Sequence, residues 1–182
     1  MLSTVGVLSC AHGAWISSSR TMGENLARAA GDGVYSTVHV PVDKAGFIAC
    51  LCEAKYIIIH THGSPDALFD QRATGDIKRI ISLRGIEEMG EIPTVQLIYM
   101  TACATAGGDP EKNVGCALSK KIAKNGMVFA NLYEVWGSDY DFGEKCGKHG
   151  WVAYRNGRRV LGPEDIPARI TPADAYNIYA HK

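Results

Sequence analysis

The chain has 182 residues, 46% of them hydrophobic, and its 19 basic and 19 acidic side chains cancel to a formal charge of zero. This length suits a single domain, residues 1–182, with a full hydrophobic core, and the balanced charge gives no support for a nucleic-acid or membrane-surface partner. No apolar run approaches the roughly 20 residues of a membrane span. The N-terminus lacks the basic region of a signal peptide, so we expect a cytoplasmic protein.

The six cysteines, at positions 10, 50, 52, 103, 116 and 146, are scattered rather than paired at the spacing of a zinc site. In a reducing compartment most cysteines behave as small buried hydrophobic residues. The sequence therefore predicts no metal site and no cofactor.

The first part of the chain alternates between strand and helix patterns. Pro41 ends one strand, and Asp43 can cap the helix that follows. The expected elements are a strand over Thr4–Leu8, a Ser-rich loop over Ala14–Ser19, a helix over Arg20–Ala30, a strand over Val34–Val40 and a helix from Asp43 through Leu51.

The remainder of the chain continues this alternation after an irregular segment, residues 64–94, which we interpret as a hairpin and a short helix. Asn156-Gly157 is a strong two-residue hairpin signal, and Thr171-Pro172 is typical of a helix start. The expected elements are a strand-like stretch over Ile80–Leu83, a helix over Arg84–Met89, a helix over about Asn113–Lys124, a strand over Met127–Tyr133, a hairpin of Trp151–Tyr154 with Arg158–Leu161, and a last helix over Ala173–Tyr179. Alternation without an internal repeat predicts an α/β fold with a doubly wound, mostly parallel sheet flanked by helices.

Two uninterrupted apolar runs end in residues that can carry out chemistry. Tyr56–Ile59 is followed by His62 and Gly63, and Val95–Met100 is followed by Cys103. Such runs are typical of buried parallel strands, and chemistry in open α/β sheets collects beyond the carboxyl ends of the strands. If the two strands are neighbours, a thiol and an imidazole emerge at the same edge, which is the minimal pair for nucleophilic catalysis.

These residues resemble the caspase-like cysteine peptidase superfamily, nearest its caspase/separase-type (CHAT) branch. The resemblance spans roughly residues 54 to 136 and rests on His62-Gly63, on the element Ser82–Met89, on Leu97–Thr105 with its Ala-Cys-x-Thr ending, and on the helix, glycine and strand up to Ala130.

The resemblance implies that Cys103 is the nucleophile and that His62 is the general acid and base. The backbone N–H groups of Gly63 and Cys103 would then form the oxyanion hole. Thr101 would lie at the base of the S1 pocket, where caspases carry Gln and metacaspase- and clostripain-like enzymes carry Asp, so the P1 preference stays open. The expected partners are a protein or peptide substrate and a regulatory protein. The sequence shows no repeat or sensor domain of the kind that this branch often carries for regulation.

The segment after the strand 127–133 helps to form the substrate pocket in this superfamily. Its carboxylates outnumber the single nearby guanidinium of Arg20, which favours a basic or uncharged P1 residue over an acidic one. A solvated acidic loop and an aromatic side chain packed on the sheet edge are the structural alternatives. The candidate residues in this segment are Glu134, Trp136, Asp139, Asp141 and Glu144.

Several alternatives stay open at this point. Cys10 and His12 also follow a strand and form a rival pair, although we interpret them as lining the site. His60 is interpreted as a packed histidine and Cys116 as a core residue. A catalytically silent caspase-like interaction module is the alternative function, and an α/β ligand-binding protein with a structural His and Cys is a third.

Overall fold

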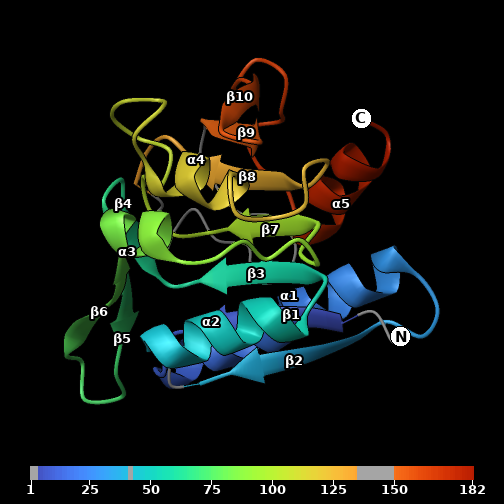
Figure 1. Ribbon diagram of the computed structural model, residues 1–182. Coiled ribbons are helices and arrows are strands. Elements are labelled where there is room, and N and C mark those ends of the chain that lie inside the picture. The colour runs from blue at the N-terminus through green and yellow to red at the C-terminus, as the bar shows by residue number, and fades with distance from the viewer. Residues whose placement is uncertain (1–3, 41–42, 135–149) are drawn as a thin grey trace.

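The computed structural model describes residues 4–40, 43–134 and 150–182. Within these ranges, seven strands form one sheet in the order β10-β9-β8-β7-β3-β1-β2 (Figure 1). The first five along the chain, β1, β2, β3, β7 and β8, run parallel to one another, whereas β9 pairs antiparallel with both β8 and β10. The prediction of a mostly parallel sheet is therefore confirmed. The strands are β1 (Thr4–Ser9), β2 (Tyr35–His39), β3 (Tyr56–His60), β7 (Leu97–Met100), β8 (Met127–Asn131), β9 (Trp151–Arg155) and β10 (Arg158–Leu161).

Helices cover both faces of this sheet (Figure 1). The helices α2 (Lys44–Glu53), α3 (Leu83–Glu88) and α4 (Val114–Ser119) pack on one face, and α1 (Gly13–Ala30) and α5 (Pro172–Ala180) pack on the other. The central strands are buried on both faces, which is why their sequences read as continuous rather than alternating apolar runs. In the part of the chain that the structure describes, no helix has the length and apolarity that a membrane crossing requires.

Side-chain caps begin the helices where the sequence predicts them. Asp43 accepts a hydrogen bond from the backbone N–H of Gly46 at 2.7 Å. Thr171 and Asp174 form a reciprocal capping box at the start of α5, with Pro172 in its first turn. Each cap satisfies backbone donors that have no partner within the helix, and it is worth about 1 kcal/mol.

The predicted Ser-rich loop over Ala14–Ser19 is wrong, because α1 begins at Gly13 and includes all of these residues. The Ser18 hydroxyl donates to the carbonyl of Ala14 at 3.3 Å and to that of Trp15 at 3.2 Å. Serine hydroxyls that bond back to helix carbonyls are satisfied inside a helix. A cluster of serines therefore did not mark a turn here.

The helix expected up to Lys124 ends at Ser119 in the structure. The residues after Ser119 form backbone hydrogen bonds with the segment that precedes β7 instead of continuing the helix. The Ile92 N–H donates to the Lys121 carbonyl at 2.6 Å, and the Ala123 N–H donates to the Val95 carbonyl at 2.9 Å. The strand expected over Met127–Tyr133 likewise ends earlier, at Asn131.

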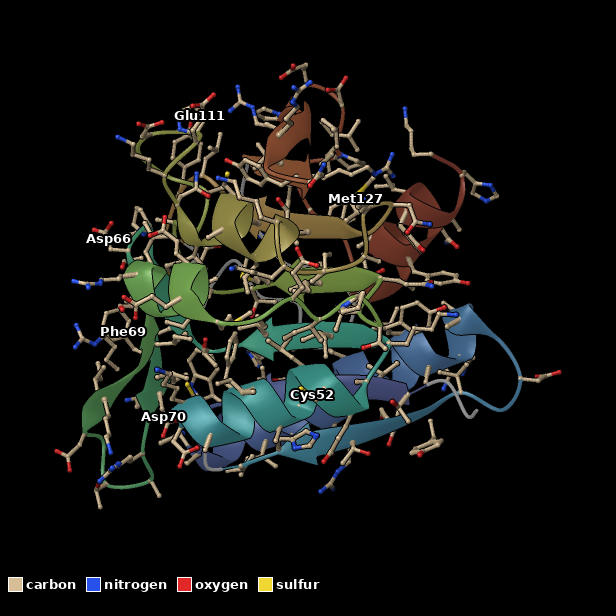
Figure 2. All side chains as sticks on the ribbon, viewed as in Figure 1. Cys52, Asp66, Phe69, Asp70, Glu111 and Met127 are labelled. Carbon is tan, nitrogen blue, oxygen red and sulfur yellow. The ribbon has the colours of Figure 1, made fainter. Side chains whose placement is uncertain are left out.

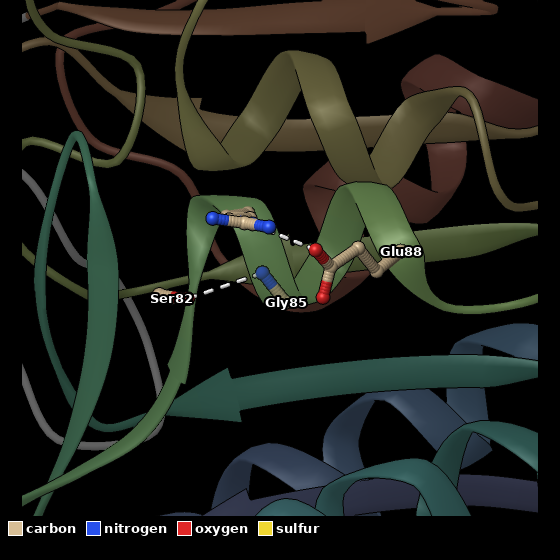
Figure 3. Close-up of polar contacts among 4 residues, drawn as sticks. Ser82, Gly85 and Glu88 are labelled. Carbon is tan, nitrogen blue, oxygen red and sulfur yellow. Dashed lines mark hydrogen bonds and ion pairs between the residues drawn. The ribbon is translucent and has the colours of Figure 1, made fainter.

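A second, three-stranded antiparallel sheet follows β3 and leads into α3. It consists of β4 (His62–Ser64), β5 (Ala67–Gln71) and β6 (Ile77–Ser82), and it lies beyond the carboxyl end of β3 (Figure 1). Ser82 caps α3 by accepting the Gly85 N–H at 3.1 Å, while Arg84 and Glu88 form an exposed ion pair at 2.7 Å (Figure 3). The predicted hairpin and helix are confirmed, although the hairpin begins earlier than its sequence indicated.

Candidate active site

The two motif-bearing strands are direct neighbours. β3 and β7 pair in parallel, with Ile59 opposite Met100, so the residues that follow each strand emerge at the same edge of the sheet. The Thr101 N–H donates to the Ile59 carbonyl at 3.0 Å, which continues the pairing by one residue. A His–Cys pair required these two strands to be neighbours, and β3 and β7 are.

Gly63 packs directly against the turn that carries Cys103. A Cβ atom at Gly63 would lie 2.8 Å from the Ala102 Cβ, 2.9 Å from the Thr105 Cγ2 and 3.1 Å from the Cys103 carbonyl oxygen. Any side chain at position 63 would therefore collide with this turn. Glycine is required here for close approach of two backbones, which is the property that the oxyanion-hole prediction assigns to it.

The turn after Cys103 holds an uncommon backbone conformation. Ala104 has a φ of 48°, in the left-handed region that alanine rarely occupies. Its N–H donates to the Tyr133 carbonyl at 2.9 Å, and the Ala106 N–H donates to the Asn131 carbonyl at 2.9 Å, so the end of β8 holds the turn in place. A strained backbone conformation persists only where neighbouring contacts hold it, and such conformations are concentrated at functional sites.

His62 is half-buried at the start of β4 and is held on two sides. Its Nε2 lies 3.0 Å from the Oε1 of Gln71 on β5, and its ring centroid lies 4.9 Å from that of Trp15 in the first turn of α1. Neither neighbour is predicted by the sequence. Trp15 fell in the predicted loop, and Gln71 fell in the irregular segment, where no strand pattern stood out.

Cys103 is half-buried, whereas Cys10, Cys50 and Cys116 are buried. Burial raises the pKa of Cys10 to about 11 and that of Cys50 to about 12, and it also raises the pKa of Cys116. A high pKa keeps a thiol protonated and poorly nucleophilic near neutral pH. The rival pair is disfavoured for this reason and because His12 is exposed at the start of α1.

His60 is a packed histidine, as the sequence analysis interpreted it. It is only 2% exposed, its Nδ1 lies 2.9 Å from the Ser19 hydroxyl, and its ring lies 4.5 Å from Trp15. Burial, together with the nearby His62, lowers the pKa of His60 to about 3. This imidazole is therefore neutral at physiological pH.

A row of buried polar residues lies at the carboxyl ends of four adjacent parallel strands. The strand register aligns them, and each is at most 2% exposed. None carries a formal charge at neutral pH, because His60 is neutral. The Asn131 amide nitrogen has no hydrogen-bond partner among the described residues, although its oxygen accepts the Tyr133 N–H at 3.0 Å. The four residues are Ser9, His60, Thr101 and Asn131.

The predicted substrate-binding residues fall into two groups. Thr101 is fully buried, and its hydroxyl donates to the Ile59 carbonyl at 3.3 Å. Trp136, Asp139 and Asp141 lie outside the described residues, as do Glu144 and Cys146. Contact of these residues with a substrate stays a prediction.

No family model and no curated protein matches the chain. Among solved structures, the chain is similar to the Arg-specific cysteine proteinase gingipain R, with a TM-score of 0.51 and 13% sequence identity. The similarity covers 74% of this chain and 33% of the gingipain chain, so the protein spans about a third of that enzyme's length. At this identity the likeness shows the fold, a caspase-like α/β sandwich with a mostly parallel sheet between helices.

Proposed function

We propose that this protein is a cysteine endopeptidase with a Cys103–His62 dyad. The observation that supports it most strongly is the contact between Gly63 and the Cys103 turn, because it joins the two motifs at one sheet edge. The fold that the chain shares with a cysteine proteinase and the strained turn at Ala104 point in the same direction. Assignment to the CHAT branch and a cytoplasmic location belong to the proposal as well.

In the proposed reaction, the Cys103 thiol gives its proton to His62, and the thiolate sulfur attacks the carbonyl carbon of the scissile peptide bond. The carbonyl oxygen becomes an oxyanion, which the N–H groups of Gly63 and Cys103 stabilise. His62 returns the proton to the leaving amine, and an acyl-enzyme thioester remains. Water, deprotonated by His62, then attacks the thioester and releases the carboxylic acid and the thiol.

We propose a basic or uncharged P1 residue. Thr101, which the resemblance places at the base of the S1 pocket, is uncharged and so supplies no cation that would attract an acidic side chain. Gingipain R, which shares the fold, is Arg-specific. The acidic residues Asp139 and Asp141 would supply the preference for a basic side chain.

A peptide-library digest tests the activity. The wild-type chain and the Cys52→Ala variant, which alters an exposed cysteine on α2, should both cleave, and Cys103→Ala and His62→Gln should not. Cleavage that survives Cys103→Ala would contradict the dyad. Absence of cleavage by every form would favour the catalytically silent interaction module.

The same digest reads the P1 preference. An Asp139→Ala, Asp141→Ala double variant should lose discrimination in favour of Arg and Lys. A strict preference for Asp at P1 in the wild type would overturn the proposed specificity, and an unchanged profile in the double variant would remove its stated cause.

A further inference from the structure

We propose that Gln71 is a positioning residue that holds the His62 imidazole in the tautomer able to accept a proton from Cys103. The proposal rests on the proposed function, because it assigns a role within that dyad. The Gln71 Oε1 lies 3.0 Å from His62 Nε2, and an amide oxygen can only accept a hydrogen bond. Nε2 therefore carries the ring hydrogen of the neutral imidazole, and the lone pair that can take up a proton resides on Nδ1.

The register of the small sheet brings these two side chains together. His62 on β4 lies opposite Phe69 on β5, and Gln71 follows Phe69 by two residues, so it points to the same face of the sheet. A diagonal neighbour of this kind is within reach of a long side chain. Asp70 lies between them on β5 (Figure 2). Its side chain therefore belongs to the opposite face of the small sheet, and its Oδ1 accepts the Ala11 N–H at 3.1 Å. Its carboxylate thus has its own partner.

The backbone of Gln71 is anchored to the main sheet. Its N–H donates to the Cys10 sulfur at 3.2 Å, and Cys10 is fully buried at the end of β1. The Cys10 N–H in turn donates to the His60 carbonyl at 3.1 Å, two residues before the imidazole that Gln71 contacts. The backbone of Gln71 and the strand that leads to His62 are therefore joined through the same buried residue, Cys10.

Trp15 completes the restraint on the imidazole. Its ring lies 4.9 Å from that of His62, inclined at 56°, and 4.5 Å from that of His60. The aromatic contact limits tilting of the His62 ring, while the Gln71 amide selects which nitrogen bears the hydrogen. In the reaction the Cys103 proton moves to Nδ1, and the resulting imidazolium still donates from Nε2 to Gln71. The proton then leaves from Nδ1 with the departing amine.

Three substitutions at position 71 separate positioning from packing. Gln71→Glu keeps an acceptor against Nε2, Gln71→Leu removes it, and Gln71→Lys replaces it with a donor. We expect Gln71→Glu to retain cleavage and Gln71→Leu to lose about 3- to 10-fold in kcat/KM, the size of one neutral hydrogen bond. Gln71→Lys should lose roughly 100-fold or more, mainly in kcat, because a donor at Nε2 favours the wrong tautomer.

The matched control is Gln96→Leu. Gln96 also accepts one hydrogen bond at 3.0 Å, from the Tyr179 hydroxyl, but it lies before β7, at the opposite end of that strand from Cys103. It should leave kcat/KM unchanged. If Gln71→Leu and Gln71→Lys each lowered kcat/KM no more than Gln96→Leu does, the proposal would be overturned.

The decisive readout does not require activity. Long-range ¹H–¹⁵N spectra of ¹⁵N-histidine-labelled Cys103→Ala protein show which nitrogen of His62 bears the hydrogen, with the signal assigned by its loss in His62→Gln. We expect Nε2–H when position 71 is the native Gln71 or carries Gln71→Glu, and Nδ1–H when it carries Gln71→Lys. An unchanged tautomer in Gln71→Lys would overturn the positioning role even in an active peptidase. The expected switch in a chain that cleaves nothing would support the positioning role and count against the proposed function.

Discussion

The Gly63→Ala substitution tests the contact on which the candidate site rests. A new Cβ atom would lie 2.8 Å from the Ala102 Cβ and 2.9 Å from the Thr105 Cγ2, whereas carbon atoms pack at about 3.5–4.0 Å. The two segments would therefore have to separate by about 1 Å. Gly63 does not have a positive φ, so the collision alone, and not backbone strain, sets the cost.

We expect two effects of different size. Overpacking should lower the free energy of unfolding by about 1–3 kcal/mol, measured by urea denaturation. A displacement of about 1 Å between His62 and Cys103 should lower kcat/KM by about 100-fold, although the substitution leaves the backbone N–H at position 63 intact. The loss of activity should therefore exceed what partial unfolding explains.

Gly90→Ala is the matched control, because no described atom lies within 4 Å of the position that a new Cβ would take there, and the φ of Gly90 is not positive. It should change the free energy of unfolding by less than about 0.5 kcal/mol and leave cleavage unchanged. The reasoning is refuted if Gly63→Ala is as stable and as active as Gly90→Ala, since the two backbones would then not be in the contact described.

Two further predictions concern individual groups. Brief iodoacetamide treatment at neutral pH followed by peptide mapping should label Cys103 faster than the other five cysteines, because the proposed dyad stabilises its thiolate through His62. Burial raises the pKa of Cys10, Cys50 and Cys116, which slows their labelling further. Uniform labelling or preferential labelling of Cys10 would count against the dyad. The pKa of His60 falls from 6.5 to about 3 on folding, so the unfolded chain binds the extra proton between these values. The free energy of unfolding should therefore fall as the pH drops from about 6.5 towards 3, by at most about 1.4 kcal/mol per pH unit, and urea unfolding at pH 7 and pH 5 should show a smaller loss in His60→Gln than in the wild type. Equal losses would show that His60 is not the group responsible.

The central sheet could be predicted from the sequence because burial on both faces leaves a local signature. The runs Tyr56–Ile59 and Leu97–Met100 contain no polar position that a half-exposed strand would need. Their polar endings then identify the edge at which His62 and Cys103 emerge. The order of the strands, with β3 beside β7, did not follow from either run alone and needed the structure.

The small sheet was harder to predict than the central sheet, because the burial of β5 and β6 is neither continuous nor alternating along the strand. β5 contains Asp70, which is only 3% exposed and is satisfied by the backbone N–H of Ala11, 59 residues earlier in the chain. A buried aspartate breaks the apolar signal of a strand. The serines of α1 have the converse effect, because they predict a loop where the structure has a helix. The Ser18 hydroxyl bonds to a carbonyl of its own helix, and the Ser19 hydroxyl bonds to His60.

These two failures concern the residues that surround His62. Trp15 belongs to the part of α1 whose serines predict a loop, and Gln71 belongs to β5, whose strand pattern Asp70 obscures. The proposed nucleophile and base, Cys103 and His62, can be recognised from the sequence because each follows a buried strand of the main sheet. The groups that contact His62, Trp15 and Gln71, come from elements whose polar residues find their partners only in the folded chain, so tertiary contacts decide the conformation of these elements. For this reason the proposed pair Cys103 and His62 could be predicted from the sequence, whereas the contacts of His62 with Trp15 and Gln71 could not.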